Sequence, residues 1–115
     1  MLCSPAWADD CSEKMTQLEL NQCYAGEYKA AQKELDEVYA GLRAALTDSK
    51  TKKAFEAVQA AWIKYRDLHC KYEVSAYEGG SIYPMVHAMC LTEKTRARTI
   101  ELKKTACEEG DVSCR

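Results

Sequence analysis

The chain has 115 residues with 16 lysines and arginines against 18 aspartates and glutamates, which gives a formal net charge of -2. This length suits one domain with a modest core. No basic run tracks a phosphate backbone and no apolar run is long enough to span a bilayer, which argues against nucleic-acid binding and a membrane span.

The N-terminal segment resembles the end of a secretory signal. Residues 6–8, Ala-Trp-Ala, fit the small-x-small rule of the cleaving peptidase. We therefore expect residues 1–8 to be a signal-peptide remnant and residues 9–115 to form a single helical domain. Cleavage after Ala8 would remove Cys3 and leave an even number of cysteines, as expected of an exported, disulfide-bonded protein. The alternative is an ordinary disordered N-terminus.

The first predicted helix begins at a capping box, in which Thr16 is followed three residues later by Glu19. It should end near Leu46, because residues 47–49 form a polar turn. Its apolar residues recur in alternating steps of four and three, the pattern of an amphipathic helix. They are Tyr24, Tyr28, Ala31, Leu35, Val38, Leu42 and Ala45.

The second predicted helix should be capped by Asp48 or Ser49 and stopped by residues 78–81, Glu-Gly-Gly-Ser. Its apolar stripe also alternates steps of three and four, and consists of Phe55, Val58, Trp62, Tyr65, His69, Tyr72 and Ala76. We expect the core to include the residues around the middle of this stripe, which are Trp62, Tyr65, Arg66 and Asp67. Arg66 could stack on Trp62, one turn away.

The third predicted helix has Pro84 in its first turn and runs to about Lys104. Two apolar faces compete on it, one with Val86, Met89, Cys90, Ala97 and Ile100, the other with Ala88, Leu91, Thr95 and Leu102. The fold class is therefore predicted to be all-α, as a disulfide-stapled antiparallel bundle of three main helices.

The cysteine spacing predicts the disulfides. Cys70 and Cys90 are equidistant from Gly80, so a helical hairpin that reverses there brings their sulfurs to one level. Six cysteines allow fifteen pairings in principle. We expect Cys70 with Cys90, Cys107 with Cys114 across a turn-rich loop, and Cys11 with Cys23 by elimination.

Enzyme and metal chemistry find little support in the sequence. There is no nucleophile elbow, phosphate-binding glycine loop or zinc-protease motif, so we expect neither an enzyme nor a cofactor. A zinc or thiol-active site would have to use His69, Cys70, His87 and Cys90. Adjacent helical residues such as His69 and Cys70 point about 100° apart, which makes them poor joint ligands.

The turn between the second and third helices is the best candidate for protein binding. It is a short, aromatic tip held by a nearby disulfide, and a rigid tip loses little entropy on docking. The candidate contact residues are Tyr77, Glu78, Gly79, Gly80, Ser81 and Tyr83. The alternative is that Ile82 and Tyr83 fold back and plug the end of the bundle.

Several segments together resemble the LprI-like lysozyme-inhibitor family. They are residues 59–70, 77–81, Cys90 and 95–102, with 19–23 and 34–39 upstream, so the resemblance covers roughly residues 10 to 103. Members of this family are small exported helical domains. In its lipid-attached members a lipobox cysteine begins the mature chain, whereas Asp9 occupies that position here.

This resemblance implies an exported, periplasmic or secreted protein-binding module that blocks the cleft of a lysozyme. That cleft presents two catalytic carboxylates. The tip could offer them hydrogen-bond donors from Ser81, from the amides of Gly79 and Gly80, or from a tyrosine hydroxyl. Alternative functions are a structural or stress-related periplasmic protein without an enzyme target, and a zinc-binding or thiol-active protein.

Overall fold

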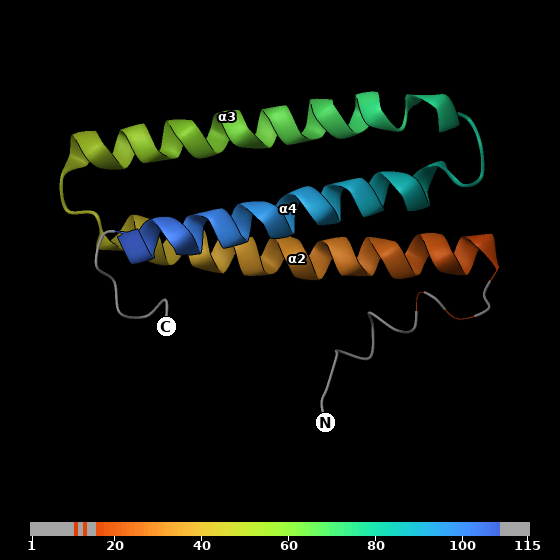
Figure 1. Cartoon of the computed structure of the whole chain (residues 1–115), viewed down its shortest axis with the longest axis horizontal. Coiled ribbons are helices and arrows are strands. Elements are labelled where there is room, and N and C mark those ends of the chain that lie inside the picture. Colours follow the sequence, from red (N-terminus) through yellow and green to blue (C-terminus); the bar gives the residue numbers. More distant parts are fainter. Residues whose placement is uncertain (1–10, 12, 14–15, 109–115) are drawn as a thin grey trace.

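The structure, a computed structural model, describes Cys11, Glu13 and residues 16–108, with side chains as far as Ala106. Its elements are α2 (Gln17–Ala45), α3 (Ser49–Glu73), the short 3-10 helix η1 (Ser75–Tyr77) and α4 (Tyr83–Glu108) (Figure 1). All regular structure in this part of the chain is helical, which confirms the all-α prediction. The predicted signal remnant and the Cys107–Cys114 bond lie outside the described residues.

Side-chain caps set the starts of the first two helices. Thr16 and Glu19 form the predicted capping box, and Asp48 accepts a hydrogen bond from the Thr51 amide at 2.8 Å. Hydrogen bonds from Thr16, first from its backbone and then from its side chain, lower the pKa of Glu19. The Thr51 backbone and side chain lower the pKa of Asp48 in the same way.

The bundle is flat, with extents of 49 × 38 × 17 Å. Helix α4 packs closely along α2, and α3 runs on the other side of α4 with fewer contacts (Figure 1). The face of α4 that is buried carries Ala88, Leu91, Thr95 and Leu102, the second of the two predicted faces. Ala31 and Leu35 are the buried apolar residues of α2. Small side chains on α4 allow the two helix backbones to come close.

Helix α3 is rotated relative to the sequence prediction. Its buried residues are Gln59, Arg66 and Cys70, whereas Val58, Tyr65 and Tyr72 of the predicted stripe are 54%, 55% and 78% exposed. The bond from Cys70 to Cys90 fixes this rotation, because Gln59, Arg66 and Cys70 share one face of the helix.

Only one of the four residues predicted for the core around Trp62 is fully buried. Arg66 is buried as expected, but Trp62 is only half-buried. The assignment of Tyr65 and Asp67 to the core was wrong. Tyr65 lies on the outward side of α3, and the Asp67 side chain is 56% exposed and pairs with Arg66 rather than with an arginine of α4.

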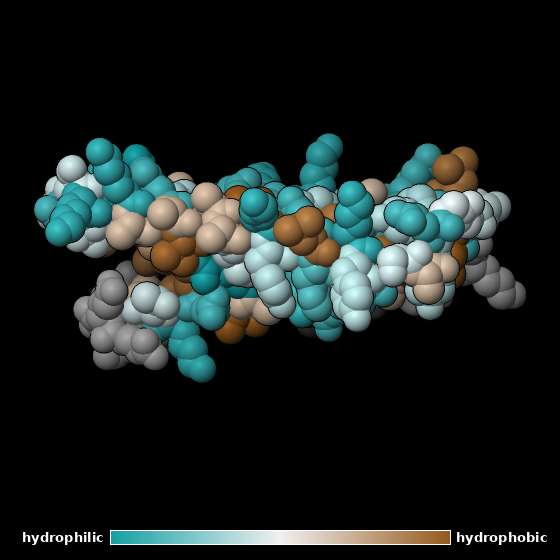
Figure 2. All heavy atoms as spheres, turned by 90° about the horizontal axis from the view of Figure 1, so that it is seen from above, coloured by the Kyte–Doolittle hydropathy of each residue, from teal (hydrophilic) through white to brown (hydrophobic). Residues whose placement is uncertain are grey.

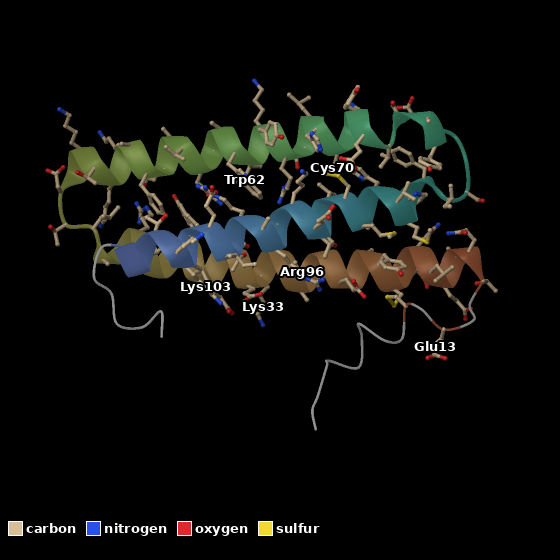
Figure 3. The ribbon with its side chains drawn as sticks, in the orientation of Figure 1. Glu13, Lys33, Trp62, Cys70, Arg96 and Lys103 are labelled. Atoms are coloured by element: carbon tan, nitrogen blue, oxygen red, sulfur yellow. A yellow bond between two sulfur atoms is a disulfide. The ribbon has the colours of Figure 1, made fainter. Side chains whose placement is uncertain are left out.

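Two disulfides are present in the described part of the chain. Cys11 is bonded to Cys23 with a Cα–Cα distance of 5.6 Å, and Cys70 to Cys90 with 5.7 Å. The first was predicted by elimination and the second from the cysteine spacing about Gly80, and both are confirmed. The first ties the segment before α2 to that helix. The second joins α3 to α4 near the hairpin turn and is almost completely buried (Figure 3).

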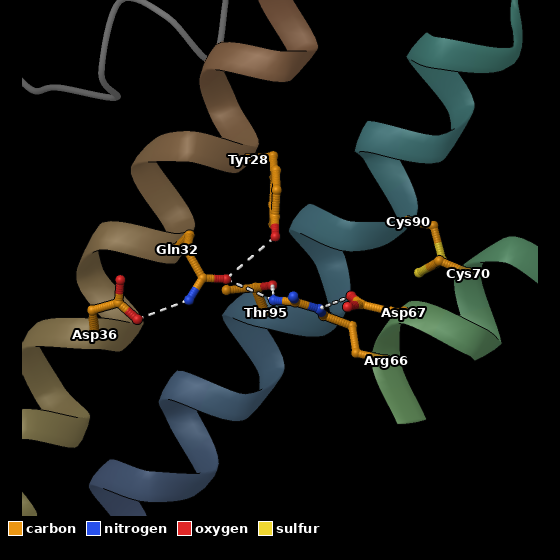
Figure 4. Close-up of polar contacts among 8 residues, drawn as sticks. All are labelled: Tyr28, Gln32, Asp36, Arg66, Asp67, Cys70, Cys90 and Thr95. Atoms are coloured by element: carbon orange, nitrogen blue, oxygen red, sulfur yellow. Dashed lines mark hydrogen bonds and ion pairs between the residues drawn. A yellow bond between two sulfur atoms is a disulfide. The ribbon is translucent and has the colours of Figure 1, made fainter. Parts of the chain in front are cut away.

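Arg66 links all three helices at the centre of the bundle (Figure 4). From α3, its guanidinium donates hydrogen bonds to Gln32 of α2 at 2.6 Å and to Thr95 of α4 at 3.2 Å. It also pairs with Asp67 at 2.9 Å. Gln32 is held in turn by Tyr28 and Asp36. A buried charge is tolerated here because Gln32, Thr95 and Asp67 all accept hydrogen bonds from it.

A second arginine shares Trp62 with Arg66. The guanidinium carbons of Arg66 and Arg98 lie 5.2 Å and 5.7 Å from the indole ring. Arg98 also donates to Gln59 of α3 at 3.1 Å and pairs with Glu101 on its own helix. In this region α3 and α4 are therefore joined by cation–π and hydrogen-bonding contacts rather than by aliphatic packing.

Replacing Arg66 by Ala should lower the free energy of unfolding by about 3 kcal/mol, because it removes charge-assisted hydrogen bonds and leaves buried Thr95 and Gln32 without their partner. Urea denaturation followed by circular dichroism measures this change. Arg43→Ala is the matched control, since the Arg43–Glu56 pair is 44% and 38% exposed and should contribute less than about 1 kcal/mol. Equal losses in the two variants would contradict a central role for Arg66.

Replacing both Cys70 and Cys90 by Ala should lower the free energy of unfolding by about 3 kcal/mol. The bond closes a loop with a sequence separation of 20, and its loss frees the unfolded chain. Urea denaturation at several protein concentrations provides the measurement, and the helical circular dichroism at 25 °C should stay unchanged. An unchanged midpoint would mean that other contacts already fix the hairpin.

Candidate functional site

The hairpin tip, residues 75–81, is an ordered turn between α3 and α4. It begins with η1, and Gly79 then takes a left-handed conformation with φ of 85°, which glycine adopts without steric cost. The Tyr77 amide donates to Val74 at 2.9 Å, and the Gly80 amide donates to Tyr77 at 3.0 Å. These local bonds fix the path of the backbone through the turn.

Contacts to the helices hold the tip in place. The Asn21 side chain on α2 donates a hydrogen bond to the Ser81 carbonyl at 3.1 Å. At the base of the hairpin, Val74 packs in one buried cluster with Cys70, Cys90 and Leu91. The tip is therefore supported by all three helices, which makes it a preorganised surface.

Five of the six predicted contact residues lie together at this end of the bundle. Tyr77 is 46% exposed, and Glu78, Gly79, Gly80 and Ser81 are exposed beside it. Tyr83 differs, because it is half-buried, packs against the cluster below the tip and stacks on His87 with ring centroids 5.4 Å apart. The structure thus removes Tyr83 from the candidate contact surface and supports the alternative that it plugs the bundle end.

A groove of about 780 Å³ adjoins the tip. Its floor is the first of the two predicted apolar faces of α4, which includes Met89, Ala97 and Ile100, and Tyr77 lines it at the tip. Met89 and Ile100 are 43% and 65% exposed. The sequence had shown two apolar faces on α4, and because α2 covers only one of them, the other remains open. The sequence analysis did not predict this groove.

One buried carboxyl lies in the groove. Glu27 of α2 is only 8% exposed, and burial raises its pKa, an effect that the nearby Arg96 guanidinium partly offsets. Arg96 lies on α4, and its side chain is drawn beside α2 in Figure 3. Glu73 and Glu93 also line the groove, so its charged groups are predominantly acidic.

Within the described residues, His69, Cys70, His87 and Cys90 do not come together as a zinc or free-thiol site. His69 Nε2 is 2.6 Å from Glu73, and these two side chains lie close to Cys90. Cys70 and Cys90 are bonded to each other, so neither offers the thiolate that zinc or nucleophilic catalysis requires. His87 is stacked on Tyr83 instead of facing the disulfide pair.

Glu27→Gln should raise the free energy of unfolding at neutral pH. A carboxyl whose pKa is raised in the folded state favours its protonated form, so ionised Glu27 costs stability at neutral pH. The cost is lost as the pH falls through the folded pKa, and the two proteins should converge once the pH is below the ordinary pKa of a glutamate. Urea denaturation across this pH range is the measurement. Glu93→Gln removes an exposed charge from the same groove and should change stability by less than about 0.5 kcal/mol.

Comparison with known proteins places the chain in a family. A sequence model of the family described as lysozyme inhibitor LprI matches residues 8–102. A relative from Rhizobium meliloti (strain 1021), described only as an uncharacterized protein, is 37% identical over 107 residues, which cover 83% of this chain and 77% of the relative. No solved structure matches significantly. Since the family match covers most of the chain, this protein belongs to the LprI lysozyme-inhibitor family.

Proposed function

We propose that this protein inhibits a lysozyme by inserting the hairpin tip into the active-site cleft. The observation that carries the proposal is the exposed, three-helix-supported tip, considered together with membership of the inhibitor family. A preorganised tip keeps its shape on docking, so little binding energy is lost in ordering it.

The tip offers two backbone or side-chain groups as hydrogen-bond donors to a partner. The Gly80 amide is already bonded to Tyr77 within the turn, so it is not available to a partner. The Ser81 hydroxyl and the Gly79 amide have no hydrogen-bond partner within the described residues, and they would donate to a cleft carboxylate. Glu78 carries the same charge as those carboxylates, so the tip would enter with Glu78 directed to the rim of the cleft.

The groove would provide the second contact. Tyr77 belongs to both the tip and the groove lining, so a protein that receives the tip would also cover the open face of α4. An apolar side chain from the cleft wall would pack between Met89 and Ile100 there. Such a buried contact next to a rigid aromatic residue is typical of the residues that dominate binding energy at interfaces.

The setting proposed for this activity is the cell envelope or the medium outside it. Two disulfides in the described part of the chain fit an extracytoplasmic protein. No helix in that part is long and apolar enough to cross a membrane. We further propose that residues 1–8 are the remnant of the export signal and that the chain is periplasmic or secreted, without enzymatic activity of its own.

Ser81→Trp should abolish inhibition, because an indole at the tip blocks entry to the cleft. Tyr77→Ala should weaken inhibition about thirtyfold, which corresponds to about 2 kcal/mol for an aromatic anchor. The assay is the loss of turbidity of a cell-wall suspension with lysozymes of several classes. Thr47→Trp is the matched control, since it places the same bulk in the exposed α2–α3 turn at the opposite end of the bundle.

Circular dichroism and thermal melting should be nearly unchanged in all three variants. If Ser81→Trp inhibits as well as the parent, the contact surface is not the tip. If the parent itself inhibits no lysozyme class at micromolar concentration, the proposed function is wrong for this chain.

A further inference from the structure

Helix α3 carries an apolar stripe that the bundle does not cover. Its residues follow steps of three and four, the spacing of a heptad seam, and they are Val58, Ala61, Tyr65, Leu68 and Tyr72. The four large ones are 54%, 55%, 59% and 78% exposed. They make up half of the eight large exposed hydrophobic side chains among the described residues. Because they share one face of a single helix, they form a contiguous apolar patch.

The packing of α3 does not require this stripe. The helix faces α4 through Gln59, Arg66 and Cys70, and the stripe lies roughly a third of a turn away. Figure 2, which views the molecule from the α3 side, shows apolar side chains lying open among charged ones. None of the stripe residues belongs to the tip or lines the groove, so the proposed inhibitory surface does not use them.

The border of the stripe is positively charged. By helical geometry Lys53, Lys64 and Lys71 follow one side of it, and Lys50 stands at its start. None of these lysines has an ion-pair partner in the described part of the chain, because the acids of α3 are engaged elsewhere. Glu56 pairs with Arg43, Asp67 pairs with Arg66, and Glu73 bonds His69.

We propose that this stripe is a docking surface for an amphipathic helix of another protein, with apolar residues at heptad spacing and an acidic border. The heptad spacing favours a helix as the occupant, because knobs-into-holes packing needs that repeat on both partners. From Val58 to Tyr72 the stripe is about 21 Å long, which suits a helix of four turns.

The positive border argues against a second copy of this chain as the occupant of the stripe. In an antiparallel pair the lysine borders of the two copies would face each other, and like charges at a seam repel. In a parallel pair Lys64 would face His69, which is already bonded to Glu73 and offers no negative charge. An acidic border on the partner instead pairs with every lysine of the stripe.

The test uses the full chain and two synthetic three-heptad peptides as probes. Both have leucine at the a and d positions, and they differ only in carrying glutamate or lysine at the e and g positions. Fluorescence anisotropy should show binding of the glutamate peptide that weakens with salt, and at least about tenfold weaker binding of the lysine peptide.

Leu68→Ser should weaken binding of the glutamate peptide by about tenfold. Leu18→Ser is the control, since Leu18 is 65% exposed on α2 outside the stripe and its loss should leave binding unchanged. Leu68→Ser should still inhibit lysozyme as the parent does, so failure of this proposal and failure of the proposed function are distinguishable.

Three outcomes would overturn the proposal. One is equal weakening by the two serine variants. Another is a concentration-dependent dimer in sedimentation that Leu68→Ser abolishes, because the stripe would then bind its own copy. The last is that neither peptide binds. Adsorption of the protein to vesicles of anionic phospholipid, in the absence of peptide binding, would then assign the lysines to a membrane surface instead.

Discussion

The burial of the Arg66 guanidinium is the constraint on which the rest of the structure depends. A charge that is 5% exposed must be matched by hydrogen-bond acceptors, and these come from α2, from α4 and from the next residue on α3. One side chain therefore fixes the relative positions of three helices. Together with the Cys70–Cys90 bond it also sets the rotation of α3, because both residues must face inward.

This rotation determines which surfaces remain free. With Gln59, Arg66 and Cys70 inside, four large apolar residues of α3 are left exposed, and the stripe from Val58 to Tyr72 follows directly. Because α3 packs beside α4 and has few contacts with α2, it leaves one face of α4 open as the groove. The polar core and both candidate binding surfaces are thus consequences of one arrangement.

Local signals in the sequence predicted a large part of the fold. The capping box at Thr16, the Asp48 cap and the level matching of Cys70 and Cys90 depend on a few neighbouring residues, and the structure contains all of them. The rotation of α3 could not be predicted this way, because apolar periodicity gives no weight to the polar residues Gln59 and Arg66. Their partners on α2 and α4 are more than 25 positions away in the chain. The groove was missed for the same reason, because tertiary packing creates it, and tertiary packing also decided between the two alternatives for Tyr83.

The two ends of the bundle are stabilised by contacts of different strength. At the hairpin end, a buried disulfide, an apolar cluster and the Asn21–Ser81 bond lie within a few turns of the tip. At the other end, the α2–α3 turn is supported by the stacked rings of Tyr39 and Phe55 and by the partly exposed Arg43–Glu56 pair. Exposed ion pairs contribute little to stability, and local unfolding starts where buried contacts are few. The α2–α3 end should therefore unfold locally before the hairpin end. The proposed binding tip is therefore placed at the more rigid end, where preorganisation favours binding most.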